Sequence, residues 1–240
     1  MKELTIKTAF ILGAGRGVRL RPLTDDIPKP LLPLGGRPLI TYAMEHLLTV
    51  GVQRFLINTH HRAEVYRRVF PENTWRGVPL VFRYEPELLD TAGGLKNIED
   101  LLAEDRDILV YNGDVVSDLP LAELLAAHEA AGAEVTLALR SSGGPLQVAL
   151  NERNEVCDIR GALGREGRKY LFTGIYVVKK TFLDRLAPGQ PRSVVDVFLE
   201  MIREATGALA GAVIDAGQWY DAGTLQEYER LRELMKGAGG

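Results

Sequence analysis

Short apolar stretches rich in branched residues alternate with longer stretches of helical period along the first 140 residues. Residues 40–50 place their apolar side chains on one face of a helix, and Gly51 is a residue suited to ending it. The pattern predicts strands at 6–12, 54–58, 79–85, 107–114 and 133–140, and helices at 40–50, 61–70, 93–104 and 121–131. Such alternation is typical of a mainly parallel sheet covered by helices.

The pattern changes after residue 140. Shorter strand-like pieces follow at 146–150, 155–160 and 170–178, then one long helix at 193–205, and then a last strand and helix. No repeat and no Pro/Gly/Ser-rich linker separates the two parts. We therefore expect one α/β domain over residues 1–240, made of two halves at 1–140 and 141–240.

Composition narrows the class of protein. The chain has 240 residues, 46% of them hydrophobic and 25% charged, with a net charge of -3. A chain of this length buries roughly 70 to 75% of its unfolded surface as one domain, so it needs no disulfide to fold, and Cys157 stands alone. The first residues lack an apolar run long enough for a signal peptide or a membrane span. We expect a soluble cytoplasmic protein with no nucleic-acid or membrane partner; the oligomeric state is left open.

The stretch LGAGRGVRLRPLTDDIPKP at residues 12–30 begins as a glycine loop after the first expected strand. Its glycines at 13, 15 and 17 allow a ligand close to the backbone, and successive N–H groups can form a nest for an anion. The dinucleotide fingerprint would need a glycine where Val18 stands. A P-loop would need Gly-Lys in place of Val18-Arg19, and Pro22 argues against a helix opening here.

Five prolines stiffen the same segment, at positions 22, 28, 30, 33 and 38. They fix backbone φ angles and lower the entropy lost on ordering a long loop. Residues 13–37 also carry five basic side chains against two acidic ones, a local charge of +3. A stiff, basic, glycine-rich loop suits a polyphosphate, and the alternative is a solvated basic turn.

A second signal is the triplet Asn112-Gly113-Asp114, which follows an apolar strand. The edge of the sheet that holds the glycine loop would then also hold the Asp114 carboxylate. Oxygen ligands suit Mg²⁺, which commonly takes one or two carboxylates and completes its shell with water and phosphate oxygens. The alternative for Asp114 is an ordinary turn. Asp221, in WYDAGT, is a second candidate, although spacing alone does not show that the two carboxylates meet.

These motifs together resemble those of the sugar-1-phosphate nucleotidyltransferases. The block at 12–38 resembles that family's signature, and the segments TAGG, NGD, FTGIYV and WYDAGT follow at 91–94, 112–114, 172–177 and 219–224. The chain is most similar to the short members of the mannose-1-phosphate guanylyltransferase and N-acetylmuramate-1-phosphate uridylyltransferase kinds. The resemblance implies a three-layer α/β/α fold with a mainly parallel central sheet, Rossmann-like and of the glycosyltransferase-A kind.

It also implies a reaction. A sugar 1-phosphate oxygen would attack the α-phosphorus of a nucleoside triphosphate, giving a nucleotide-sugar and pyrophosphate. Residues 1–140 would bind the nucleotide and 141–240 the sugar phosphate. The resemblance assigns Arg19 to the triphosphate, Lys29 to the α-phosphate region, and Asp114 with Asp221 to Mg²⁺. It places the nucleotide and sugar against Leu12, Gly13, Ala14, Gly15, Glu85, Thr91, Asn112, Thr173 and Gly174.

The choice of base depends on Glu85. A carboxylate complements the paired N1–H and N2–H donors of guanine, whereas uracil offers it one donor, so GTP with a mannose-1-phosphate-like sugar is slightly favoured. The alternatives are UTP with N-acetylmuramate 1-phosphate or another hexose 1-phosphate, and a non-catalytic regulator of the same fold. Glu85 could instead cap the chain or pair with Arg83 on a surface strand, and Thr173 could be an ordinary core residue.

The chain departs from the family at several positions. Asp90 occupies a place that is glycine in many relatives, and Val18 one that is often threonine or serine. The usual Glu-Lys-Pro segment, whose lysine binds the sugar phosphate, is absent. Four basic residues lie in that region and could replace the lysine: Arg160, Arg165, Arg168 and Lys169. A sugar-transferring enzyme of related fold would carry Asp-x-Asp where this chain has Asn-Gly-Asp.

Overall fold

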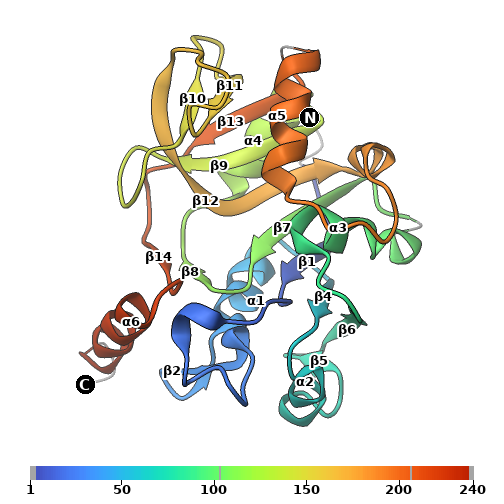
Figure 1. Ribbon diagram of the computed structural model, residues 1–240, viewed down its shortest axis with the longest axis vertical. Coiled ribbons are helices and arrows are strands. Elements are labelled where there is room, and N and C mark those ends of the chain that lie inside the picture. The colour runs from blue at the N-terminus through green and yellow to red at the C-terminus, as the bar shows by residue number, and fades with distance from the viewer. Residues whose placement is uncertain (1–3, 103, 206, 238–240) are drawn as a thin grey trace.

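A computed structural model describes residues 4–237 except 103 and 206. At its centre, strand β1 (Thr8–Leu12) lies between β4 (Arg54–Thr59) and β7 (Asp107–Asn112), and β6 (Val78–Tyr84) lies beyond β4 (Figure 1). All of these neighbours are parallel, and Leu12 at the end of β1 is in register with Asn112 at the end of β7. Because the strands run the same way, the loops that follow β1 and β7 meet at one edge of the sheet.

The strands of the second half extend this sheet. Long strand β12 (Arg168–Lys179) pairs antiparallel with β7 and with β9 (Val135–Arg140), which pairs in parallel with β13 (Leu209–Val213). A hairpin of β10 (Val148–Leu150) and β11 (Val156–Ile159) continues from β12, and β5 (Thr74–Trp75) pairs with β6 at the far edge. The expected α/β class is confirmed, with the parallel strands concentrated in the first half.

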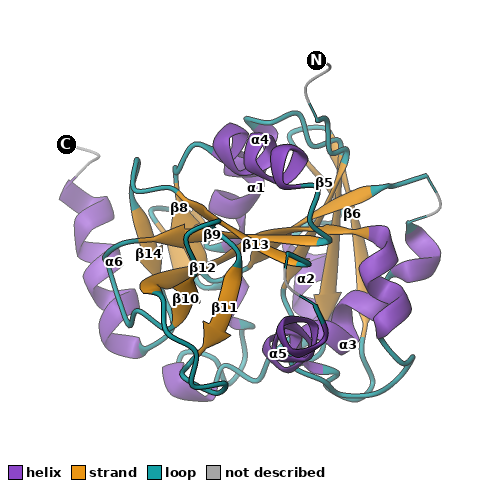
Figure 2. Cartoon of the chain, turned by 90° about the horizontal axis from the view of Figure 1, so that it is seen from above, coloured by secondary structure: helices purple, strands orange, loops and turns teal. Residues whose placement is uncertain are grey.

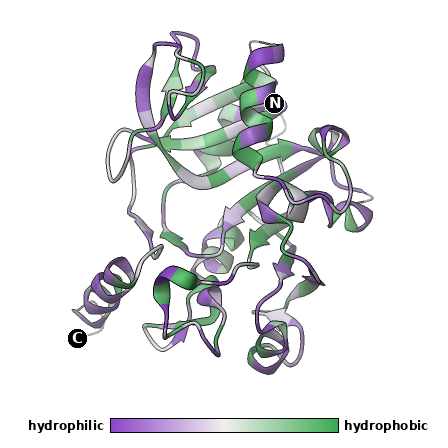
Figure 3. Ribbon diagram, in the orientation of Figure 1, coloured by the Kyte–Doolittle hydropathy of each residue, from purple (hydrophilic) through white to green (hydrophobic). Residues whose placement is uncertain are grey.

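Helices cover both faces of the sheet. Helices α1 (Ile40–Leu48), α2 (Ala63–Val69) and α4 (Leu121–Ala131) contribute to the core on the face of Ala9 and Ile11. Helices α3 (Asp90–Lys96) and α5 (Val194–Glu204) pack on the opposite face, with Phe10. Figure 2 shows the sheet between the α1/α4 layer and the α3/α5 layer, and Figure 3 shows hydrophobic residues concentrated in the strands. Fully burying a side chain such as Phe10 contributes about 1.5–3 kcal/mol.

The glycine- and proline-rich segment packs against the C-terminal part of the chain. It contains two short 3-10 helices, η1 (Val18–Leu20) and η2 (Lys29–Leu31), followed by the hairpin of β2 (Pro33–Leu34) and β3 (Arg37–Pro38). Its apolar residues form a third core with β8 (Val115–Ser117) and α6 (Leu225–Gly237). No α-helix opens at the glycine loop, as Pro22 predicted.

One predicted helix is wrong in extent. Residues 93–104 form the end of α3 and the separate 3-10 helix η3 (Glu99–Leu101), while residue 103 lies outside the described residues. Helix α3 already begins at Asp90, where the backbone of Ala92 donates to the carbonyl of Arg192. It ends at Lys96, and its C-cap is Asn97, a residue whose side chain competes with helical hydrogen bonding. The contact with Arg192 therefore explains why α3 begins earlier than predicted, and the side chain of Asn97 explains why it ends earlier.

The remaining short elements complete the chain: η4 (Lys180–Arg185) follows β12, and β14 (Trp219–Asp221) pairs antiparallel with β8 just before α6. Among the described residues, no helix is both long and apolar enough to cross a membrane.

Candidate functional site

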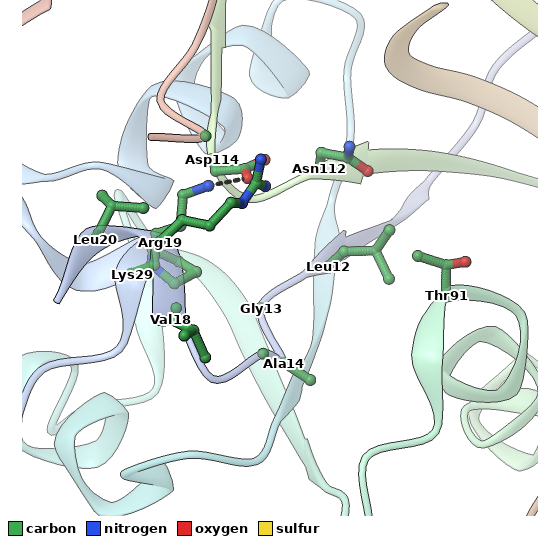
Figure 4. A pocket seen from close by; sticks show the side chains of 14 residues that line it. Leu12, Gly13, Ala14, Val18, Arg19, Leu20, Lys29, Thr91, Asn112 and Asp114 are labelled. Atoms are coloured by element: carbon green, nitrogen blue, oxygen red, sulfur yellow. Dashed lines mark hydrogen bonds and ion pairs between the residues drawn. The ribbon is translucent and has the colours of Figure 1, made fainter. Parts of the chain in front are cut away.

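A cavity of about 310 Å³ lies where the loops after β1 and β7 meet. Ligand pockets in proteins typically begin at about this size. It is lined by Leu12, Gly13, Ala14, Gly15, Gly17, Val18, Arg19, Leu20, Lys29, Pro30, Thr91, Asn112, Asp114 and Gly223. Most of the residues expected to bind the nucleotide are therefore brought together, with Thr91 facing the glycine loop from the other side (Figure 4).

Lys29 and Asp114 form an ion pair in this cavity (Figure 4). We name the cavity the nucleotide-side pocket, after the ligand that the sequence resemblance predicts for its residues. The side chains of Lys29 and Asp114 are 12% and 26% exposed, so the pair is partly withdrawn from water but open to a ligand. Lys29 is the first residue of η2 and stands between Pro28 and Pro30, which hold its backbone in place. Arg19 belongs to η1, is exposed, and lines the same pocket.

Asp221 lies beside Asp114 although the two are far apart in sequence. Strand β14 places Asp221 opposite Val115 of β8, and the backbone of Ala222 donates to the carbonyl of Asp114 at 3.0 Å. Burial, and then the neighbouring Asp114 carboxylate, raise the pKa of Asp221 to about 6, while Lys29 acts in the opposite direction. The buried Oδ1 of Asp221 has no hydrogen-bond partner among the described residues.

The two carboxylates fit a divalent cation held jointly with a substrate. An unpartnered buried carboxylate oxygen is costly, and a bound cation would satisfy it. The described residues contain no cluster of three or more His, Cys, Asp or Glu side chains able to hold a metal alone. Mg²⁺ commonly uses one or two carboxylates with phosphate oxygens, and this is the donor set that Asp114 and Asp221 offer.

The anion nest of the glycine loop is smaller than the sequence suggested. The backbone N–H groups of Gly13 and Ala14 donate to Oδ1 of Asn58 at 2.8 and 3.3 Å, so they are already occupied. In the part of the chain that the structure describes, the N–H groups of residues 15–18 have no hydrogen-bond partner. These later positions are the ones that can donate to a phosphate.

Glu85 does not lie where the base-contacting prediction requires. It is completely buried, does not line the pocket, and accepts hydrogen bonds from Nδ2 of Asn58 at 2.8 Å and the backbone of Leu89 at 3.0 Å. Burial raises its pKa, and these hydrogen bonds offset part of the rise. The surface pairing with Arg83 is also wrong, because Arg83 pairs with Asp100. Sequence alone did not reveal that Asn58 would reach Glu85.

A second cavity, of about 420 Å³, adjoins the first at Asn112. We name it the sugar-side pocket, after the ligand that the sequence resemblance predicts for the second half of the chain. Its lining comes from the loop at 143–145, β12, β14 and α6, and includes Thr173, Gly174 and Asp221. The hydroxyl of Thr173 is buried and donates to the carbonyl of Ala138 at 2.8 Å, which fits the alternative of a core residue, while Thr173 also lines this pocket. Asp114 lines one pocket and Asp221 the other.

The cation of the sugar-side pocket is a residue that sequence reasoning missed. Arg230 of α6 is the single basic residue among those lining it. None of the four expected replacements for the absent lysine lines this pocket: Arg160, Arg165 and Lys169 surround a separate depression beside β10 and β11, and Arg168 lies over the ring of Tyr170. The basic pattern of the last helix offered no signal that singled out Arg230.

Comparison with known proteins identifies the class. The family model described as "Nucleotidyl transferase" matches residues 8–236, so the chain belongs to the nucleotidyl transferase family. Sequence relatives give a more particular likeness. The chain is 31% identical over 234 residues to a mannose-1-phosphate guanylyltransferase of Mycobacterium tuberculosis, covering 95% of this chain and 65% of that protein.

A mannose-1-phosphate guanyltransferase of Schizosaccharomyces pombe is also 31% identical, over 227 residues, with 92% of this chain and 62% of that protein covered. The chain therefore spans less than two thirds of these relatives. Its fold is similar to that of a putative glucose-1-phosphate thymidylyltransferase from Bacillus anthracis, with a TM-score of 0.81, 22% identity and 95% of each chain covered.

Proposed function

We propose that this chain transfers a nucleoside monophosphate from a nucleoside triphosphate to a sugar 1-phosphate, releasing pyrophosphate. One observation carries the proposal: two cations and two carboxylates from four separate segments meet at the junction of two adjoining pockets. The names of the sequence relatives support the same reaction.

The chemistry suits these residues. The second pKa of a phosphate monoester is about 6, so the nucleophile is mostly a dianion at neutral pH and needs no general base. One of its oxygens forms a bond to the α-phosphorus, the bond from that phosphorus to the oxygen bridging to the β-phosphorus breaks, and pyrophosphate leaves. The barrier is then mainly electrostatic, because one anion approaches another. Lys29 and Arg19 bind the triphosphate from the glycine-loop side and balance the charge that develops there.

Asp114 and Asp221 would hold the Mg²⁺ that this proposal includes. A bound divalent cation supplies further neutralisation of phosphate charge. The chain itself holds the two carboxylates together by the β8–β14 pairing and by the hydrogen bond from Ala222. Lys29 keeps Asp114 oriented toward the junction of the pockets.

Each of the two pockets binds one of the two substrates. The nucleotide-side pocket is lined almost wholly from residues 12–114, and the sugar-side pocket mostly from residues 143–234, which supports the two predicted halves of the domain. GTP and a mannose-1-phosphate-like sugar are favoured by the relatives' names, since Glu85 no longer offers an argument about the base. UTP with another sugar 1-phosphate remains the alternative. A cytoplasmic location remains a prediction from the sequence.

Two other classes of function fit the site less well. A non-catalytic regulator would be free to lose one of the four charged residues, and all four are present. A sugar-transferring enzyme would need Asp-x-Asp at the junction. The triplet Asp105-Arg106-Asp107 stands instead at the opposite end of β7, where Asp105 pairs with Arg54 and Asp107 with His128.

The test is a substrate matrix. The protein is incubated with each of the four ribonucleoside triphosphates and dTTP, with Mg²⁺ and a panel of sugar 1-phosphates, and pyrophosphate and nucleotide-sugar are measured. We expect pyrophosphate only when triphosphate and sugar 1-phosphate are both present, with GTP and mannose 1-phosphate among the active pairs. Tight nucleotide-sugar binding with no pyrophosphate from any pair would support the regulator and overturn the enzyme.

A further inference from the structure

The side chain of Asn58 hydrogen-bonds the start of the glycine loop to the neighbouring strand β4. Asn58 is the fifth residue of β4 and 2% exposed, and its Oδ1 accepts hydrogen bonds from the backbone of Gly13 and Ala14. The hydroxyl of Tyr66 donates to the carbonyl of Gly13 at 2.9 Å. The peptide group between Gly13 and Ala14 is therefore hydrogen-bonded through its carbonyl to Tyr66 and through its N–H to Asn58. A Cβ at position 13 would stand 2.7 Å from the carbonyl oxygen of Asn58. The start of the loop therefore has one fixed position.

Glu85 and the loop backbone together determine which way the Asn58 amide faces. A carboxylate only accepts hydrogen bonds, so the amide nitrogen of Asn58 must point to Glu85, and its oxygen must point to the loop. The other Glu85 oxygen accepts from the backbone of Leu89, next to the α3 segment that contributes Thr91 to the pocket. A Cβ on Gly94 would lie 2.7 Å from Nδ2 of Asn58 and 2.9 Å from Oε1 of Glu85, so the helix packs closely on the pair.

We propose that Glu85 is a positioning residue that joins the two walls of the nucleotide-side pocket. Through Asn58 it holds the glycine loop, and through Leu89 it holds the segment that carries Thr91. The inference rests on the proposed function. Glu85 acts on every nucleotide alike, because it sets the distance between the phosphate-binding loop and the opposite wall and does not select the base.

The test exchanges the two polar groups. In Glu85→Gln the new amide nitrogen faces either the Asn58 nitrogen or the Leu89 N–H, so two donors meet. In Asn58→Asp two carboxylates meet. In the double variant, an aspartate at 58 accepts from Gly13, Ala14 and the glutamine nitrogen, and the glutamine oxygen accepts from Leu89. The hydrogen-bond pattern is restored with the net charge unchanged. Glu87→Gln is the matched control, since Glu87 is exposed and has no partner among the described residues.

Affinities for GTP and UTP are measured by calorimetry, together with KM, kcat and Tm. Leaving a buried polar group unpaired has a cost equivalent to about a 5- to 150-fold change in an equilibrium constant, and displacement of the loop to relieve it would weaken nucleotide binding by up to that factor. We expect each single variant to weaken GTP and UTP binding equally. The double variant should recover most of that loss, and Glu87→Gln should match the unaltered protein. A changed GTP-to-UTP ratio in Glu85→Gln alone would show that Glu85 reads the base and would overturn the proposal. A lowered Tm with unaltered affinities would also overturn it, because the role would then be structural only.

Amide hydrogen exchange at Gly13 and Ala14 keeps this test separate from the proposed activity. If the unaltered protein bound no triphosphate, the proposed function would fail, yet the exchange measurement would still be informative. We expect these two amides to be protected in the unaltered protein, to exchange at least tenfold faster in either single variant, and to regain protection in the double variant. Equal exchange rates in all variants would contradict a role for Glu85 in holding the loop.

Discussion

The two pockets that meet at Asp114 and Asp221 are built in different ways. The nucleotide-side pocket combines backbone fixed by buried hydrogen bonds, as at Gly13, with the ion pair between Lys29 and Asp114. The sugar-side pocket is assembled from a glycine-containing loop, a bulged strand and one face of α6, and its cation Arg230 has no ion-pair partner among the described residues. Under the proposed function, the fixed backbone of the first pocket would receive the triphosphate, and the cation Arg230 of the second would be free to pair with the sugar phosphate.

The largest expected effect comes from the paired charges of the nucleotide side. Lys29→Met or Asp114→Asn should lower kcat/KM by about a hundredfold or more, because each removes charge stabilisation at the reacting phosphate. Turnover is measured by pyrophosphate release, and Tm confirms folding. Arg21→Ala, which removes an exposed loop cation that pairs only with Asp25 among the described residues, serves as the control. Less than a threefold loss in both charge variants would remove these residues from the mechanism.

The junction of the pockets should show an unusual pH dependence. The folded-state pKa of Asp221 is about 6, above the ordinary value of 3.8, so the folded protein binds this proton more tightly than the unfolded chain. Without divalent cations, the free energy of unfolding should therefore fall as pH rises from about 4 to 6. Above that range Asp221 is ionised and the free energy of unfolding should fall no further on its account. Asp221→Asn removes the cost, and it should raise the free energy of unfolding at pH 7.5 by about 1 to 3 kcal/mol.

Thermal denaturation in EDTA between pH 4.5 and 8 measures this effect. Addition of Mg²⁺ should stabilise the unaltered protein at pH 7.5 and have little effect on Asp221→Asn. The apparent affinity for Mg²⁺ should rise as pH increases through about 6, since cation binding needs the ionised carboxylate. Identical stability profiles for the two proteins would show that burial and the Asp114 charge do not raise the pKa of Asp221.

The smallest expected effect is on the KM of one substrate only, and it distinguishes the roles of the two pockets. Arg230→Ala should raise KM for the sugar 1-phosphate about tenfold and leave KM for the triphosphate unchanged, because Arg230 is exposed and its charge-assisted hydrogen bond falls at the low end of about 1.5–3 kcal/mol. Arg232→Ala is the matched control on the same helix, where Arg232 lies over the Tyr228 ring and outside the pocket. Equal increases in both KM values would mean that the pockets do not divide the substrates as proposed.

The sequence predicted the nucleotide side better than the sugar side, for a physical reason. Residues 12–30 and 112–114 are contiguous motifs whose glycines, prolines and charges express their chemistry locally, and parallel strands bring their ends together. Arg230 and the loop at 143–145 meet only after the whole chain folds. The predicted contact between Glu85 and the base was wrong because burial of a carboxylate depends on its hydrogen-bond partners. These are Asn58 and Leu89, and no local sequence pattern identifies them.

The central claim is that Asp114 and Asp221 share a cation with a triphosphate bound by Lys29. A crystal structure with Mn²⁺ and a non-hydrolysable GTP analogue, with anomalous diffraction at the manganese edge, tests it most directly. We predict one strong anomalous peak within coordination distance of a carboxylate oxygen from each aspartate and of the α-phosphate, with Lys29 contacting the phosphates. A nucleotide bound in the pocket with no peak between the two carboxylates would contradict the account.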